Sequence, residues 1–384
     1  MNYRINLFGM TMMRGLMIIL LSLVPLLETF GQDPQFSQYY ASPLYLNPGF
    51  AGTGFSHRIA LNSRIQWPSL PQAFITHSFS WDMNQPSFNS GFGILALNDK
   101  AGSVGLSNSS VGLVYAYKLH LGRWVMSPGI RFAYHIQNVD RSRMLAGDQI
   151  EFGGGAGTPS LDPAINNVRN VTYFDFDFGG LIYNARYWLG ASVSHLNRPN
   201  ASFIEDDYRL PMKFTAHAGM KIPLNTGIFA SERPTHIAPS FVYKMQDDFD
   251  QLDIGINYYY QPVNIGLWYR GVPIQRFTGP QQDTYLSHDA LIFLIGFAMW
   301  NFEFNYSYDF TISQLGIKTN GAHEFSMIFQ FQSGKFKRIK ERHKPIPCPA
   351  FYNDNLNMNM PDWLRKKKDK NNYKENYKIY RRNK

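Results

Sequence analysis

The 384-residue chain has a single cysteine, Cys348. One thiol cannot form a disulfide within one molecule, so sheet hydrogen bonds and packing must stabilise the fold. Long apolar runs are also scarce. The longest, GLMIILLSLVPLL at 15–27, is too short for a comfortable helical span of a membrane. A disulfide-stapled domain and a helical membrane bundle are therefore excluded.

The apolar run near the start has the pattern of an export signal. Arg4 and Arg14 precede it, and Thr29 and Gly31 suit the −3 and −1 positions of a signal-peptidase site. We therefore expect 1–31 to be a signal peptide that is cleaved before Gln32. A transmembrane anchor and a buried helix are the alternatives for this stretch.

Motifs of catalysis and metal binding are also missing. GFGILA (91–96) lies inside a strand pattern, and GGGAG (153–157) is not followed by Lys-Ser/Thr. His323-Glu324 lacks the second histidine of a zinc motif, and the aspartates of 247–253 lack the terminal glutamate of a calcium loop. We expect no enzyme, no cofactor and no bound metal. A barrel lipase built on His77 with neighbouring serines is a remote alternative.

Alternating aromatic and polar residues are abundant instead. NFEFNYSYDF (301–310) places Phe and Tyr on even positions, with Glu303 and Asp309 among the odd ones. YFDFDF (173–178) repeats the pattern with Asp175 and Asp177. Successive side chains of a strand point to opposite faces, so each segment has one aromatic and one polar face. A helical period of 3.6 would mix the two sets.

Runs of this kind recur along the chain and predict fourteen strands. They are 55–66, 73–82, 90–98, 108–121, 123–137, 172–184, 186–197, 212–223, 236–246, 250–261, 263–271, 288–299, 301–311 and 321–332. Gly122, Ala185, Pro262 and Trp300 mark very short connections, whereas most of the alternate connections are long. This asymmetry is typical of outer-membrane barrels.

We therefore predict an all-β fold, a transmembrane antiparallel barrel of about fourteen strands over 55–332. Aromatic residues near the tight turns fit a girdle at one membrane interface. They are Trp124, Tyr187, Trp188, Tyr258, Tyr259, Tyr260, Trp300 and Phe302. On this reading the aromatic faces meet lipid, and the lumen-facing polar residues Asp175, Asp177, Glu303 and Asp309 meet water. A large soluble β-sandwich or propeller is the alternative.

The basic character of the chain lies in its last fifty residues. The stretch 335–384 has 16 Lys or Arg and 5 Asp or Glu, a net of +11, so the rest of the chain nets −2 of the total +9. We expect 333–384 to be a periplasmic extension. Lys366, Lys367, Lys368, Arg381 and Arg382 could dock on an acidic protein or an anionic surface. A solvated, disordered tail is the equal alternative, and nucleic acid is not expected as a partner.

A Pro- and Gly-punctuated segment, 32–54, precedes the first strand, and we expect it on the periplasmic side: QDPQFSQYYASPLYLNPGFAGTG. We expect it to fold into the mouth of the lumen as a plug or docking surface, with a mere leader into the first strand as the alternative. Its candidate docking residues are Asp33, Pro34, Gln35, Phe36, Ser37, Gln38, Tyr39, Asn47, Pro48 and Gly49.

This segment, with RIQWP (64–68), LPMKFTAHAG (210–219), IGLWYRG (265–271) and YDFTISQLG with GAHEFSMIFQF (308–331), resembles the PorP/SprF family of type IX secretion outer-membrane proteins. The resemblance covers about 32–332, and the basic tail departs from it. It implies a non-enzymatic barrel for secretion or surface attachment of client proteins with a C-terminal secretion domain, often linked to gliding motility. It also implies partners: a periplasmic peptidoglycan-associated lipoprotein and other secretion components. The rival reading is an outer-membrane channel for small or hydrophobic solutes.

Overall fold

A computed structural model describes residues 33–54, 57–70, 73–102, 105–144, 149, 167–204, 207–224, 235–247, 249–260, 262–278, 284–299, 301–313 and 319–331. The chain divides into two units, Met1–Pro34 and Gln35–Lys384, and all strands belong to the second. Among the described residues, no helix has the length and apolar character needed to cross a membrane.

The second unit is built from antiparallel strands and a few short helices. The strands are β1 His57–Gln66, β2 Phe74–Gln85, β3 Ser90–Ala101, β4 Leu106–Tyr117, β5 Leu119–Leu121, β6 Trp124–Asn138, β7 Val171–Tyr183, β8 Tyr187–Ser194, β9 Lys213–Met220, β10 Ile222–Pro223, β11 Thr235–Gln246, β12 Phe249–Tyr260, β13 Val263–Thr278, β14 Thr284–Met299, β15 Phe302–Thr311 and β16 Ala322–Phe331. The helices are η1 Tyr39–Ala41, α2 Pro43–Leu46, η2 Pro48–Phe50, η3 Pro86–Phe88 and η4 Arg141–Arg143.

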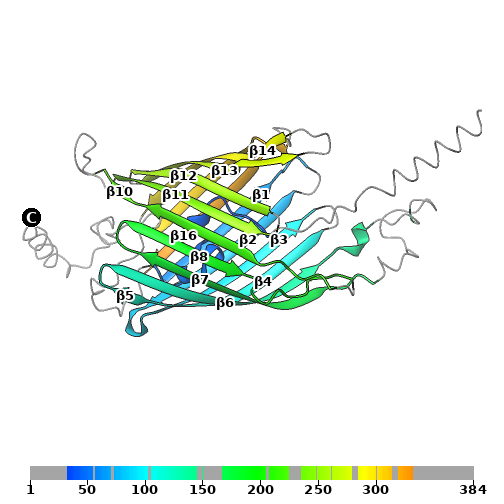
Figure 1. Ribbon diagram of the computed structural model, residues 1–384, viewed down its shortest axis with the longest axis horizontal. Coiled ribbons are helices and arrows are strands. Elements are labelled where there is room, and N and C mark those ends of the chain that lie inside the picture. Colours follow the sequence, from blue (N-terminus) through cyan, green and yellow to red (C-terminus); the bar gives the residue numbers. More distant parts are fainter. Residues whose placement is uncertain are drawn as a thin grey trace, which may run out of the picture. The chain divides into compact units, whose positions relative to one another are not determined.

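The strands form one sheet that closes on itself. Strands that follow one another in the sequence pair, except that β4 pairs with β6 and β9 with β11, and β16 returns to pair with β1 from His57↔Phe331 to Gln66↔Ala322. We call each strand position in the barrel wall a stave. β4 and β5 follow one another along the same neighbour, β6, and together make one stave. β9 and β10 do the same along β11. The result is a closed 14-strand antiparallel barrel (Figure 1), which confirms the predicted fold class.

Two staves are interrupted where we predicted continuous strands over 108–121 and 212–223. The backbone N–H of Lys118 donates to the carbonyl of Asn89 at 2.7 Å, and that of Lys221 donates to the carbonyl of Arg186 at 2.7 Å. Both amides therefore leave the ladder for a neighbouring turn.

The strands β13 and β14 are longer than the predicted 263–271 and 288–299. Their pairing continues past Arg270, through shifts of register, as far as Thr278↔Thr284. The alternation pattern fades at these shifts, because a bulge changes which face a side chain takes.

The two faces of the wall have opposite character. In β15 Phe304 is 47% exposed, whereas Glu303 is 4% exposed. In β7 Phe176 is 46% exposed and Asp175 is fully buried. The apolar side chains therefore point outward and the polar ones inward, as the alternation predicts for a barrel in lipid.

Candidate functional site: the segment inside the barrel

The interior of the barrel is occupied by residues 35–54, drawn in blue between the strands in Figure 1. Two prolines start its short helices, since Pro43 is the first residue of α2 and Pro48 the first of η2, positions where a missing N–H costs nothing. Asn47 separates the helices and caps η2, because its Oδ1 accepts the N–H of Gly49 at 2.8 Å. Periodic sheet pairing is replaced by tight local turns.

The C-terminal half of this segment, Asn47–Gly54, is bound mainly through backbone groups. Asn47 Nδ2 donates to the carbonyls of Gly180 and Ala191, at 3.0 and 3.1 Å. The Ser127 hydroxyl donates to the carbonyl of Gly49 at 2.8 Å, and the N–H of Gly52 donates to Asp82 Oδ2 at 2.8 Å. These bonds reach β7, β8, β6 and β2.

Glycines in the wall allow this half to approach so closely. A Cβ on Gly91 of β3 would lie 2.0 Å from the carbonyl oxygen of Ala51. A Cβ on Gly129 of β6 would lie 2.6 Å from the backbone N of Gly49. Backbone atoms cannot move aside as a flexible side chain can, so only glycine fits at these positions.

The N-terminal end of the segment, Ser37–Gln38, is bound by charged side chains. The consecutive N–H groups of Ser37 and Gln38 donate to the two carboxylate oxygens of Glu324, at 2.7 and 3.0 Å. The Ser37 hydroxyl donates to Asp309 Oδ2 at 2.6 Å and accepts from Arg64 at 2.7 Å and Arg270 at 2.8 Å. A carboxylate that receives two backbone N–H groups makes strong, charge-assisted hydrogen bonds.

The groups around Ser37 form a buried network of balanced charge. Arg64 pairs with Asp309 at 2.8 Å and with Glu324 at 3.3 Å. Arg270 pairs with Asp309 at 2.9 Å and with Asp253 at 3.0 Å. Lys244 completes it, 3.6 Å from Asp253, so that three cations face three carboxylates. Removal of any one member would leave an uncompensated buried charge.

Between its two ends the segment packs through aromatic and apolar side chains. The ring of Tyr39 lies edge-on to Trp268 at 5.2 Å between centroids, and Phe50 stacks on His217 at 5.2 Å. Leu44 of α2 and Leu181 of β7 belong to the same buried cluster. This core lies inside the barrel, so residues 35–54 fill space that would otherwise hold water.

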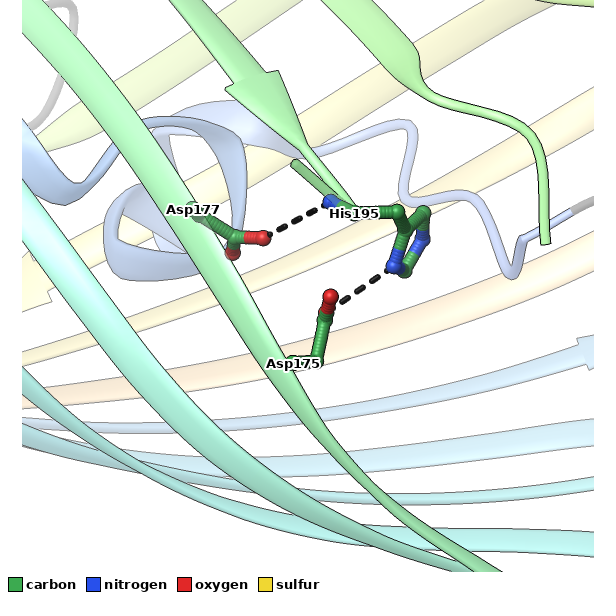
Figure 2. A group of neighbouring side chains, drawn as sticks. All are labelled: Asp175, Asp177 and His195. Carbon is green, nitrogen blue, oxygen red and sulfur yellow. Dashed lines mark hydrogen bonds and ion pairs between the residues drawn. The ribbon is translucent and has the colours of Figure 1, made fainter. Parts of the chain in front are cut away.

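A second cluster of polar side chains joins the inner face of β7 to His195, which directly follows β8. Figure 2 shows the ring of His195 beside Asp175 and its backbone N–H beside Asp177. His195 Nδ1 and Asp175 Oδ2 are 2.9 Å apart, and the His195 N–H donates to Asp177 at 3.2 Å. The three offer ligand atoms within 4.8 Å of one another. Arg131 already pairs with Asp177, and His135 lies 3.7 Å from Asp175. These contacts account for the cluster as a buried ion network.

The predicted lumen-facing aspartates and glutamate are all buried on the inner face of the wall. We expected these side chains to face water, but they are shielded from bulk solvent. Asp309 contacts Ser37 and two arginines, Asp177 pairs with Arg131, and Glu303 accepts from Asn305 Nδ2 at 3.0 Å. Asp309 thus contacts the segment and cations, Asp177 contacts a cation, and Glu303 contacts a neighbouring amide of its own strand.

The predicted docking residues Gln35 to Gln38, Tyr39, Asn47, Pro48 and Gly49 belong to the segment inside the barrel. Asp33 and Pro34 belong to the preceding unit. Lys366, Lys367, Lys368, Arg381 and Arg382 lie outside the described residues, as do the signal sequence and Cys348.

Two members of the predicted aromatic girdle point the other way. Trp188 is 2% exposed and Tyr259 is 1% exposed, and both belong to the inner core. They alternate with outward neighbours, Tyr187 at 47% and Tyr258 at 42% exposure. Strand parity decides the face that a side chain takes, and closeness to a turn does not.

The alternation of β2 places the residues of the candidate lipase site on opposite faces of the wall. Ser78 and Ser80 are buried on the inner face of β2, whereas His77, which precedes them, is exposed on the outer face. Side chains on opposite faces of one strand cannot form a catalytic pair. In the candidate calcium loop at 247–253, Asp253 pairs with Arg270 inside the barrel.

The residues that sequence reasoning missed are the partners of the segment, above all Arg64, Arg270 and Glu324. Each lies on the polar face of an alternating strand, and this was a usable signal. A long charged side chain that points into a barrel needs a partner there. Which partner it takes depends on closure of the sheet.

A closed antiparallel wall with an apolar outer face and a polar, filled interior defines an outer-membrane β-barrel protein. The sequence matches the family described as type IX secretion system membrane protein PorP/SprF over residues 28–329. The chain therefore belongs to this family, which confirms the resemblance noted from its motifs. The fold and the family place it in the outer membrane, and membership implies interaction with other type IX secretion components.

No curated protein sequence matches the chain. Among solved structures, the Pseudomonas putida toluene transporter TodX is 10% identical and covers 75% of this chain and 93% of its own, with a TM-score of 0.41. Acinetobacter baumannii Omp33 is 6% identical, covers 73% and 100%, and has a TM-score of 0.38. A mutant of the Rhodopseudomonas blastica porin is 9% identical, covers 72% and 99%, and has a TM-score of 0.30. Scores this low carry no argument about function.

Proposed function

We propose that this protein is a non-enzymatic barrel of the type IX secretion system that supports secretion or surface attachment of client proteins and contributes to gliding motility. The observation that carries the proposal is the interior filled by residues 35–54, a stretch within the region that resembles the family and that the family match covers. We expect a segment that fills the lumen to narrow any aqueous path, so that the barrel acts through contacts at its mouths. The rival reading, a solute channel, needs an open path.

The partners we propose are a client with a C-terminal secretion domain and a periplasmic peptidoglycan-associated lipoprotein. The mature chain starts at Gln32 after signal cleavage, and the extension 333–384 lies in the periplasm. Its basic residues, Lys366, Lys367, Lys368, Arg381 and Arg382, favour an acidic docking surface there.

Deletion of residues 33–52 tests the role of the segment. We expect a barrel that still inserts, because its wall is closed by strand pairing alone, but that no longer displays its client on the cell surface. The matched control keeps the length and composition of 33–52 in scrambled order, and it should fail in the same way. Unchanged display by the deletion variant would refute the proposal.

Planar-bilayer recording separates the two readings. The intact protein should show no steady conductance, and the deletion variant should show open-channel conductance because the segment no longer fills the lumen. Steady, substrate-dependent conductance by the intact protein would favour the solute channel instead.

A further inference from the structure

The barrel has two mouths that the strand ends define. At the first mouth β1 begins with His57 and β16 ends with Phe331, which pair with each other. At the second mouth β1 ends with Gln66 and β16 begins with Ala322, again a pair. Any group that contacts these strands can therefore be placed by its distance from either mouth.

The last residues of the segment lie at the first mouth. The side chain of Asn84 donates to the carbonyl of Gly54 at 3.3 Å, and Asn84 is next to the last residue of β2, Gln85. Lys118, between β4 and β5, donates to the carbonyl of Gly52 at the same end.

The first residues of the segment lie at the second mouth. Ser37 contacts Arg64, Asp309 and Glu324, each two residues from the end of its strand at this mouth. The side chain of Tyr45, from the middle of the segment, also reaches toward this mouth: its ring packs edge-on to Phe36, and its hydroxyl accepts from Lys213, the first residue of β9, at 3.3 Å.

The side chains of β1 contact the segment at three points along its length. Three side chains of β1 contact the segment in reverse order of sequence: Arg58 donates to the carbonyl of Phe50 at 3.3 Å, Asn62 donates to the carbonyl of Ala41 at 3.0 Å, and Arg64 donates to the Ser37 hydroxyl at 2.7 Å. Arg58 and Arg64 are about 20 Å apart along a strand that rises about 3.3 Å per residue. A segment that turned back inside the lumen would not give this order.

We propose that residues 35–54 run through the barrel from mouth to mouth. Gln35 then lies at the second mouth, whereas Phe331 lies at the first. A partner that binds at Gln35 and one that binds at Phe331 sit on opposite sides of the outer membrane. The first mouth is the periplasmic one if β1 starts in the periplasm, which makes Gln35 a surface-side attachment point.

Single cysteines test this arrangement in the Cys348→Ser background. Gln35→Cys reports on the start of the segment, Asp207→Cys on an exposed loop between β8 and β9 at the second mouth, and Arg186→Cys on an exposed turn at the first mouth. A membrane-impermeant maleimide is applied to intact cells and then to lysed cells. We expect positions 35 and 207 to react under the same condition, and position 186 under the other.

Reaction of position 35 together with position 186 would overturn the proposal. Gln35 is half-buried, so a thiol there could be silent in both conditions. In that event an epitope inserted between Pro34 and Gln35 takes its place, and antibody binding to intact or lysed cells gives the same decision. Neither readout involves client display, so the proposed function can fail while this topology holds, and the reverse.

Discussion

The two ends of the segment, Ser37–Gln38 and Asn47–Gly54, contact the barrel wall in different ways. At Ser37–Gln38 two arginines and two carboxylates converge on one hydroxyl and two N–H groups. Asp253 and Lys244 extend this charged network behind Arg270. At Asn47–Gly54 charged side chains also bind the segment, since Asp82 and Lys118 contact Gly52 and Arg58 contacts the carbonyl of Phe50. What this end has in addition is close contact with strand backbones, with glycine at the contact, as at Gly91 and Gly129.

The difference concerns how each end can respond to change. Charged side chains can rearrange and exchange partners, and their interactions depend on every member being present. Close backbone packing is rigid, and an added methyl group at the contact has nowhere to go. We infer that the Ser37 end is the adjustable attachment and that the Asn47–Gly54 end is the fixed one.

Substitution of Arg64 should have the largest effect. Arg64→Met leaves Asp309 and Glu324 without their shared cation, and we expect a loss of about 3–5 kcal/mol in the free energy of unfolding. The measurement is urea unfolding of the protein refolded in bilayers. Arg209→Met is the matched control, because its pair with Asp207 is exposed and should contribute at most about 1 kcal/mol. Equal losses in the two variants would contradict the role of the network.

A methyl group at Gly91 should have a smaller effect, about 1–3 kcal/mol, because it meets the backbone of Ala51. The displaced segment should also expose position 53, so a Thr53→Cys thiol in the Cys348→Ser background should react faster in Gly91→Ala. Gly180→Ala is the control, since nothing lies within 4 Å of a Cβ there. If both glycine variants behave alike, close packing does not fix this end.

Loss of one hydrogen bond should have a still smaller effect. Ser127→Ala removes the donor to the carbonyl of Gly49, and we expect about 0.5–1.5 kcal/mol from urea unfolding. Ser142→Ala removes an exposed hydroxyl outside the segment and should leave stability unchanged. A loss in Ser127→Ala as large as that in Arg64→Met would abolish the contrast between the two ends.

The smallest expected quantity is the coupling between the ends. Arg64 and Gly91 share no partner, so the double variant Arg64→Met with Gly91→Ala should lose the sum of the single losses within about 0.5 kcal/mol. A larger interaction energy in the double-mutant cycle would mean that the segment is released as one body, and the two ends would then form a single attachment.

The barrel itself was predictable from the sequence because alternation acts locally. Asp175 next to Phe176 and Glu303 next to Phe304 already separate the two faces of the wall. The staves were found for the same reason. The errors fell where a local rule was wrong or absent, as for Trp188, which was placed by its closeness to a turn, and for the long β13, whose bulge disturbs the period.

The site was less predictable because its contacts join distant parts of the sequence. Ser37 and Glu324 are 287 residues apart, and no periodicity links them. The segment consists of single turns of helix, for which the sequence has punctuation but no repeating pattern. Its place in the lumen could be expected from its prolines and aromatics, but its direction follows only from the order of contacts along β1.

Closure between β1 and β16 has a consequence for assembly. The wall has no free edge along this seam, so a chain inside it has no sideways exit and can enter or depart only lengthwise. Glu324 lies in β16, which follows every other strand in the sequence. Ser37 can therefore bind its carboxylate partner only after β16 has been exported. Pairing of the β15–β16 hairpin with β1 thus closes the barrel around the chain's own N-terminal segment.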